Sequence, residues 1–174
     1  RIIEKITNEL ILFNVAASDP NVNVRRTASE KISDQKELIK IFRTETDKAI
    51  KTNIIKKIES QEVLEEVARN ESDTTIRKIA LSKIESEDII KSLLENESDK
   101  YIRKTAVEKI EEQEFLVKIA LSDSAKEVRK AAVIKIKDQA ALSKIVINES
   151  ERDICESALA TINNQVLLYD IFIN

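Results

Sequence analysis

The sequence contains no glycine, histidine, methionine or tryptophan, and it has a single proline and a single cysteine. The lack of glycine disfavours tight β-hairpins and phosphate-binding loops, because both need residues that readily adopt positive φ. The lack of histidine removes imidazole acid–base catalysis, the triad base and two-histidine metal sites. We therefore predict that the protein is not an enzyme, with no catalytic residues, no metal site and no cofactor.

The scarcity of cysteine and of long apolar runs bears on where the protein works. One cysteine, Cys155, excludes an internal disulfide and is typical of a reducing compartment, so we expect a cytoplasmic protein. No apolar run approaches the roughly 20 residues of a membrane helix, and we expect no membrane partner. The net charge of −3 does not favour nucleic-acid binding by the molecule as a whole.

A repeat of 26 residues runs through the chain. Glutamine recurs at this interval, with Glu87 in the one place where it is missing; the glutamines are Gln35, Gln61, Gln113, Gln139 and Gln165. Cutting after each of these residues predicts six full repeats within one domain, 1–174: residues 10–35, 36–61, 62–87, 88–113, 114–139 and 140–165. Residues 1–9 match the tail of an earlier repeat, and residues 166–174 match the head of a later one.

Two apolar stripes mark two helices in each repeat. Numbering each repeat from 1 to 26, positions 3 and 6 are aliphatic throughout, position 15 is Val or Ile, position 19 is almost always Ala and position 23 is always Ile. These spacings are helical. One such pair cannot bury its own stripe, so stacked neighbours must supply the core. The predicted fold is all-α, a right-handed α-α superhelix (solenoid) of six full two-helix repeats with a half repeat at each end.

The polar residues between the stripes predict the helix ends. Position 11, for example Ser72 and Ser98, is expected to cap the second helix, and Asp19 with Pro20 takes this place in the first repeat. Position 25 is expected to cap the following first helix. Asn at position 9, as in Asn70, suggests a left-handed residue ending the first helix. We expect first helices of about nine residues and second helices of about twelve.

The stretches DPNVNVRRTASEKI (19–32) and DSAKEVRKAAVIKI (123–136) resemble the HEAT repeat, an armadillo-type α-solenoid family, and the resemblance extends over the whole chain. In that family an acidic residue precedes the second helix, followed by Val-Arg and a stripe of small and aliphatic residues. The unit of 26 residues is short for HEAT and close in length to leucine-rich repeat variants. The resemblance implies a non-catalytic binding scaffold whose second helices line a concave surface.

Position 16 is basic in five of the six repeats and holds Arg25, Arg77, Arg103 and Arg129. The resemblance implies a structural ladder in which this arginine bonds an acidic residue and backbone carbonyls between repeats. The acids would be Asp73 and Asp99, or Asp19 and Asp123. Direct contact with a ligand is the alternative. The lysine at position 22 is expected to favour the negative end of the helix dipole.

Basic residues at positions 13 and 17 lie on the side of the second helix opposite its apolar stripe. They include Arg26, Lys78, Lys100, Lys104, Lys126 and Lys130. Lysine in the first turn of a helix opposes the helix dipole, so helix stability does not explain this pattern. One interpretation is a solvated face neutralised by nearby glutamates. The other is a partner-binding stripe beside the acidic edge formed by Glu30, Glu59, Glu85, Glu108 and Glu111.

These observations favour a protein-binding scaffold that takes an acidic protein or peptide segment on the basic stripe. The alternative is a nucleic-acid-binding solenoid that uses the same face of the second helices. The terminal segments suggest a further contact. Residues 166–174 are apolar on nearly every side, and Ile2, Ile3 and Ile6 form a similar group at the start. We therefore expect either that the array continues beyond this chain or that its ends pack against another molecule.

Overall fold

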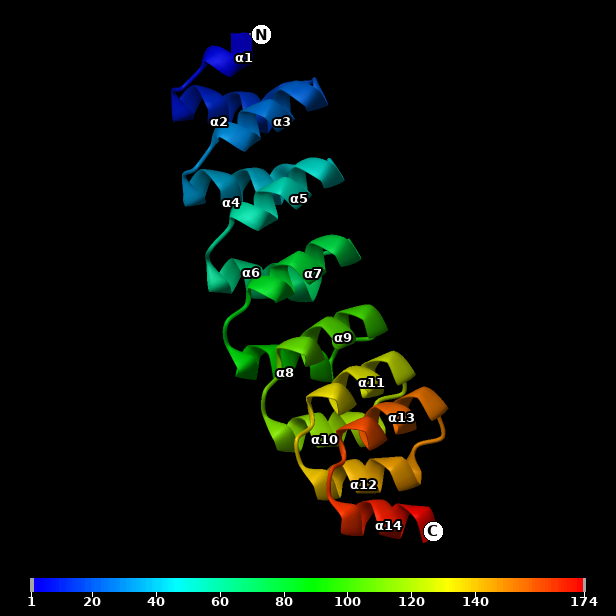
Figure 1. The fold of residues 1–174 in the computed structure, drawn as a ribbon. Helices are drawn as coiled ribbons and strands as arrows, with labels where there is room; N and C mark the ends of the chain where they lie inside the picture. The colour runs from blue at the N-terminus through cyan, green and yellow to red at the C-terminus, as the bar shows by residue number, and fades with distance from the viewer. Residues whose placement is uncertain (1, 174) are drawn as a thin grey trace. The chain divides into compact units, whose positions relative to one another are not determined.

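The computed structural model describes residues 2–173, and within this range it is entirely helical, with fourteen helices and no strand. Its helices are α1 (Ile2–Lys5), α2 (Glu9–Ser18), α3 (Val22–Lys31), α4 (Gln35–Thr44), α5 (Lys48–Lys57), α6 (Gln61–Asn70), α7 (Thr74–Lys83), α8 (Glu87–Glu95), α9 (Lys100–Lys109), α10 (Gln113–Ser122), α11 (Lys126–Lys135), α12 (Gln139–Asn148), α13 (Arg152–Thr161) and α14 (Gln165–Ile173). The all-α prediction is confirmed for these residues (Figure 1). The chain divides into two compact units, Arg1–Glu85 and Ser86–Asn174.

Within each unit, helices pack against their partner in the pair, and most of them also pack against the equivalent helix of a neighbouring pair. In the first unit α2 packs on α3, α6 on α7, and α3 and α7 both contact α5. In the second unit α10 packs on α11, α12 on α13, and α11 lies between α9 and α13. Nearly all of the complete helices have ten residues, so the expected difference in length between first and second helices is wrong.

The apolar stripes form the core of both units. Isoleucine at position 23 is almost completely buried in every repeat, from Ile32 (0% exposed) to Ile162 (6%). Alanine at position 19, as in Ala28 and Ala132, is also 0% exposed. A methyl side chain at this position lets neighbouring helices approach closely, and the branched residues around it fill the remaining space. Burial of these stripes by neighbours is what stabilises helices that are only three turns long.

The second helices α3, α5, α7 and α9 are capped one residue later than the sequence suggested, and α11 and α13 have no side-chain cap. Position 12 supplies the cap: Asp47, Asp73 and Asp99 accept hydrogen bonds from backbone N–H groups of the first turn of α5, α7 and α9. The expected cap by Asp19 with Pro20 is wrong as well, because α3 begins at Val22 and Asn21 caps it. Position 25 caps the following first helix, as predicted, where it holds a short polar side chain, as at Asp34 and Ser60.

The first helices end without a left-handed residue, because no described residue has positive φ. In α6 the helix runs through Asn70, and Glu71 leaves it in an extended conformation with φ −69° and ψ 136°. The N–H of Glu71 still donates to the carbonyl of Val67 at 3.0 Å, so the last turn is closed. This extended residue at position 10 directs the chain to the next helix and, as shown below, carries the acid of the ladder.

Candidate binding surface

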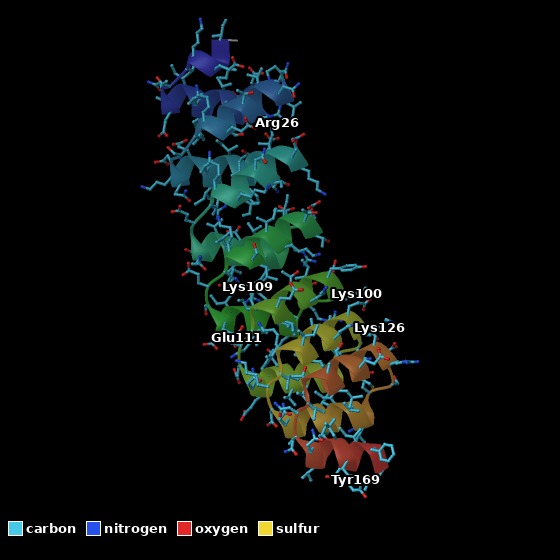
Figure 2. All side chains as sticks on the ribbon, in the orientation of Figure 1. Arg26, Lys100, Lys109, Glu111, Lys126 and Tyr169 are labelled. Atoms are coloured by element: carbon cyan, nitrogen blue, oxygen red, sulfur yellow. The ribbon has the colours of Figure 1, made fainter. Side chains whose placement is uncertain are left out.

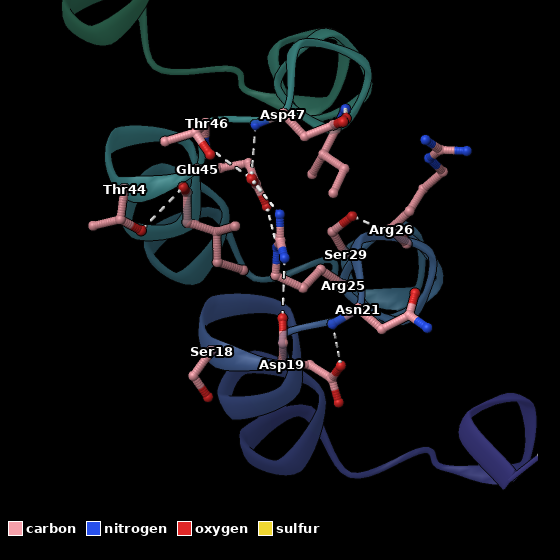
Figure 3. Close-up of polar contacts among 12 residues, drawn as sticks. Ser18, Asp19, Asn21, Arg25, Arg26, Ser29, Thr44, Glu45, Thr46 and Asp47 are labelled. Atoms are coloured by element: carbon pink, nitrogen blue, oxygen red, sulfur yellow. Dashed lines mark hydrogen bonds and ion pairs between the residues drawn. The ribbon is translucent and has the colours of Figure 1, made fainter.

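An arginine–carboxylate bridge joins successive repeats at the helix turns. Nε and Nη2 of Arg25 donate to the two carboxylate oxygens of Glu45 at 2.9 and 3.0 Å, as Figure 3 shows. Nη1 of Arg25 donates to the carbonyl of Asp19 in its own repeat at 3.0 Å. The side chain of Glu45 is only 3% exposed. Because Glu45 also accepts the N–H groups of Thr46 and Asp47, the bridge fixes the turn that precedes α5.

The same bridge recurs along the chain with constant spacing. Arg103 binds Asp123 through two bonds of 2.9 Å, and Arg129 binds Glu149 at 2.6 and 3.0 Å. Lys51 forms the equivalent ion pair with Glu71 in the first unit. In each case position 16 of one repeat reaches position 10 of the next, 20 residues later. Two parallel N–H···O bonds to one carboxylate fix orientation as well as distance, so this ladder sets the register between repeats.

The acids of the ladder are only in part those first expected. Asp73 lies at the N-terminus of α7, where it caps Thr75 and Ile76 and pairs with Lys48 at 2.7 Å. Asp99 caps α9 in the same way. Both positions have an extended backbone, but a carboxylate at position 12 is held to the first turn of its own helix, whereas one at position 10 accepts the cation of the preceding repeat. Of the other pair considered, Asp123 accepts Arg103, and Asp19 contributes its carbonyl to Arg25. Arg77 holds the equivalent position in α7.

The bridges change the acidity of the buried carboxyl groups. The hydrogen bond from Arg129 lowers the pKa of Glu149 below its ordinary value, although burial acts in the opposite direction. The hydrogen bond from Arg25 lowers the pKa of Glu45 in the same way. Both acids are thus charged at neutral pH, and each is balanced by a neighbouring cation.

A second ladder, which the sequence pattern did not reveal, is formed by the lysines at position 22. Lys57 Nζ donates to the carbonyls of Ser29, Glu30 (3.1 Å) and Ile32, which end α3 of the preceding repeat. Lys83 binds the end of α5, and Lys31 binds the end of α1, with the same spacing. The lysine therefore satisfies carbonyls left open at the end of the neighbouring second helix, where a cation is also favoured by the helix dipole.

The repeated glutamine forms a third ladder, which explains its regularity. Nε2 of Gln35 donates to the carbonyl of Lys57 at 3.0 Å, and its Oε1 accepts the N–H of Glu59 at 3.0 Å. Gln61, Gln113 and Gln139 make the same pair of bonds to residues 22 and 24 positions ahead. Glutamine has both a donor and an acceptor in one amide, which this pair of contacts requires.

The basic residues of positions 13 and 17 lie on second helices of both units. Arg26 and Lys78 belong to α3 and α7 in the first unit, and both are half-buried. The remaining four lie on α9 and α11 in the second unit: Lys100, Lys104, Lys126 and Lys130. Figure 2 labels Arg26, Lys100 and Lys126 on their helices.

In the second unit these lysines are paired with acids. Lys100 binds Glu127 at 2.7 Å, Lys130 binds Asp153 at 2.8 Å and Lys126 binds Glu151 at 3.3 Å. Glu127 and Asp153 lie in the first turn of the next second helix and Glu151 directly precedes α13, so lysines and carboxylates alternate from α9 to α11 and from α11 to α13. The surface is therefore locally neutral and rich in both charges, rather than uniformly basic.

A groove of about 480 Å³ opens between α9 and α11 on this surface. Lys104, Glu108, Glu127, Lys130, Ala131, Ile134 and Lys135 line it. Ile134 is 63% exposed, and Ala131 beside it is 8% exposed. Position 21, which Ile134 occupies, is charged or small in the other repeats (Glu30, Lys56, Ser82, Glu108, Ala160). Ile134 is therefore the one large apolar residue at position 21 among the six repeats. This departure from the repeat is the sequence signal for the groove, and the repeat pattern alone did not reveal it.

Reactive groups are sparse in the described residues, where no cluster of three His, Cys, Asp or Glu side chains could hold a metal ion. Cys155 replaces the position-16 arginine in α13, and its Sγ lies 3.4 Å from the carbonyl of Glu149. Burial raises the pKa of this thiol, so little of it is in the nucleophilic thiolate form at neutral pH. None of the helices in residues 2–173 combines the length and the apolar character of a membrane span. Comparisons with protein-family models, curated proteins and solved structures find no match for the chain.

Proposed function

We propose that this chain is a non-catalytic protein-binding scaffold of the cytoplasm, which takes an acidic peptide segment on the exposed surface of its second helices. In this proposal the six sequence repeats are HEAT-like units of a right-handed α-α superhelix. The three ladders support it, because they use partly buried arginine, lysine and glutamine side chains to hold the repeats together. The outward positions of the second helices remain available for a partner.

The groove between α9 and α11 is the observation that carries the proposal. Its exposed Ile134 offers an apolar contact, and Lys104 and Lys130 stand beside it. An apolar side chain set in a small pocket and surrounded by polar groups is the usual form of an interface anchor. A segment with one large apolar residue flanked by Asp or Glu fits this surface, because its carboxylates can exchange with those that now pair the lysines.

The ion pairs also favour a peptide over a nucleic acid. Phosphate binding gains its free energy when cations neutralise phosphates and release counterions. Here Lys100 and Lys130 already have carboxylate partners at 2.7 and 2.8 Å, and the neighbouring acids would repel a polyanion. A short peptide can place its charges to match an alternating pattern, whereas the regularly spaced phosphates of a duplex cannot.

A direct test compares three labelled probes by fluorescence anisotropy. The first is a peptide with a central Leu between acidic residues, the second is the same peptide with Lys in place of each acid, and the third is a generic DNA duplex. The proposal predicts saturable binding of the acidic peptide, weakened by Ile134→Ser. Binding of the duplex alone, falling steeply with salt, would establish the nucleic-acid alternative instead. A failure of all three probes would contradict the proposed surface.

A further inference from the structure

Arg26, in the first unit, is a cation of the second helices that has no acid partner. The lysines at positions 13 and 17 of α9 and α11 all form ion pairs with carboxylates. The side chain of Arg26 forms no hydrogen bond or ion pair with any residue from 2 to 173, and its Nε is shielded from water. In Figure 3 its guanidinium points away from the Arg25–Glu45 bridge. A shielded N–H without an acceptor is unfavourable, so this side chain has bonding capacity that the folded chain leaves unused.

A single residue of the next repeat accounts for the missing partner. Lys130 pairs at 2.8 Å with Asp153, which lies 23 residues later at position 14 of the next repeat. The residue at the same interval from Arg26 is Ala49, whose methyl group cannot accept a hydrogen bond. At position 14 the first unit has only uncharged residues, whereas α11 and α13 of the second unit have acids. The neutralising carboxylate of the second unit is therefore absent beside Arg26.

Arg26 lines a hollow of about 700 Å³ that is formed by α3, α5 and the start of α7. Two further polar side chains in its lining have unused capacity, because the Asn53 amide and the Thr75 hydroxyl form no hydrogen bond within residues 2–173. Lys48 adds a second cation to the lining. Its side chain is 62% exposed and pairs with Asp73 at 2.7 Å, so it can exchange partners at the surface.

The charges of the hollow favour an anion. Its lining has two cations and one acid, Asp47. The carboxylate of Asp47 is held to its own helix, where it accepts the N–H of Ile50 at 2.9 Å. The remaining groups can donate hydrogen bonds, and those of Arg26, Asn53 and Thr75 have no acceptor in the described part of the chain.

A phosphoryl group matches this set of donors better than a carboxylate does. The phosphoryl group of a phosphorylated serine or threonine has three acceptor oxygens and a charge of about −1.5 to −2 at neutral pH. A guanidinium can donate two parallel N–H···O bonds to two of these oxygens. Asn53 and Thr75 can then donate to the third. A carboxylate has only two oxygens and one charge, so it would leave some of these donors unused.

The lining also indicates what carries the phosphoryl group. None of the residues that line the hollow is aromatic, so a nucleobase would find no side chain to stack on. Its only apolar residue is Ala49, which offers too little surface to bind a lipid chain. The hollow is open along the helices, and a polypeptide has room to continue on either side of a modified residue.

We propose that the first unit binds a phosphorylated serine or threonine of a protein partner. Arg26 holds the phosphoryl group through its guanidinium, and Asn53 and Thr75 donate the remaining hydrogen bonds. Lys48 supplies the second positive charge. This site lies wholly within the first unit and does not depend on the groove between α9 and α11.

An NMR titration of the isotope-labelled full chain tests the site directly. The probe is a peptide of alanine and glycine residues with one central phosphoserine, compared with the same peptide carrying serine or glutamate there, and with inorganic phosphate. We expect saturable shifts of the Arg26 Nε–H and Asn53 side-chain resonances with the phosphoserine peptide. The serine and glutamate peptides and inorganic phosphate should bind roughly tenfold more weakly or worse, as expected when charge-assisted hydrogen bonds are lost.

Two variants and a matched control complete the test, with circular dichroism to check their fold. Ala49→Asp places a carboxylate where Asp153 stands relative to Lys130, and an acid is also favourable in the first turn of α5. This variant and Arg26→Gln should each bind the phosphoserine peptide roughly tenfold more weakly or worse. Arg43→Gln changes an exposed arginine of the first helix α4 in the same unit and should bind normally.

Several results would overturn the proposal. They are the absence of shifts at Arg26 and Asn53, and unchanged binding by a folded Ala49→Asp variant. Equal affinity for the glutamate peptide would show an ordinary carboxylate site, and equal affinity for inorganic phosphate would remove the protein partner. None of these results bears on the α9–α11 groove, because the peptides contain no large apolar residue.

Discussion

Arg103 and Asp123 face each other across two repeats, with both carboxylate oxygens 2.9 Å from guanidinium nitrogens. The two side chains are 12% and 6% exposed, so the pair is largely removed from water. Arg103 also donates to the carbonyl of Ser98 at 2.8 Å. One side chain thus links the turn of its own repeat to the turn of the next, and the ladder is part of the fold rather than of an exposed binding site.

Arg103→Ala is expected to lower the free energy of unfolding by ~1–3 kcal/mol, because it leaves the buried Asp123 carboxylate without its cation. The matched control is Arg152→Ala, whose side chain is 91% exposed and pairs with Glu156 on one helix. An exposed pair of this kind is worth only about 0–1 kcal/mol. Urea unfolding followed by circular dichroism measures both variants. Equal, small effects would remove the structural role assigned to position 16.

Acid is expected to weaken the ladder. The pKa of Glu149 in the folded chain is lowered from its ordinary value of 4.5, first by the hydrogen bond from Arg129. The folded chain therefore binds the proton less readily than the unfolded chain. The stabilisation is fully present above about pH 4.5 and is lost as pH falls through the lower, folded pKa. The difference in unfolding free energy between the wild-type chain and Glu149→Gln should consequently shrink as the pH of the urea titration is lowered below this value. A constant difference across the series would contradict this linkage.

The lysine ladder can be extended by one residue. Thr161 holds the position of Lys57 and Lys83, so Thr161→Lys should place an ammonium group at the carbonyls that end α11. We expect a gain of about 0.3–1 kcal/mol, as for other cations at helix C-termini. Asn163→Lys adds the same charge two residues away and serves as the control. If both lysines change the unfolding free energy equally, the gain is one of net charge and not of capping.

The sequence predicted the helices well because their apolar positions recur without interruption, and packing then leaves few alternatives. It was less informative about the ladder acids. Position 10 is acidic in every repeat, as Asp or Glu, whereas position 12 is aspartate only at Asp47, Asp73 and Asp99, so the more regular of the two signals was not the one used. The backbone is extended at both positions, and only the hydrogen bonds distinguish them: the position-12 aspartates accept N–H groups of their own helix, whereas the position-10 acids accept the cation of the preceding repeat. The groove depends on one residue, Ile134, and a single departure from a repeat has no periodic signal.

The central claim is that the α9–α11 surface binds an acidic peptide, and reversing its charge tests this most directly. Lys104→Glu combined with Lys130→Glu should abolish binding of the acidic peptide probe, since two attractive charges become repulsive beside Ile134. Lys118→Glu combined with Lys144→Glu reverses two exposed lysines on the first helices α10 and α12 of the same unit and should leave binding unchanged. Isothermal titration of both double variants, with circular dichroism confirming their fold, provides the measurement. Loss of binding only in the first double variant is the result predicted here, and unchanged affinity in that variant would contradict the account.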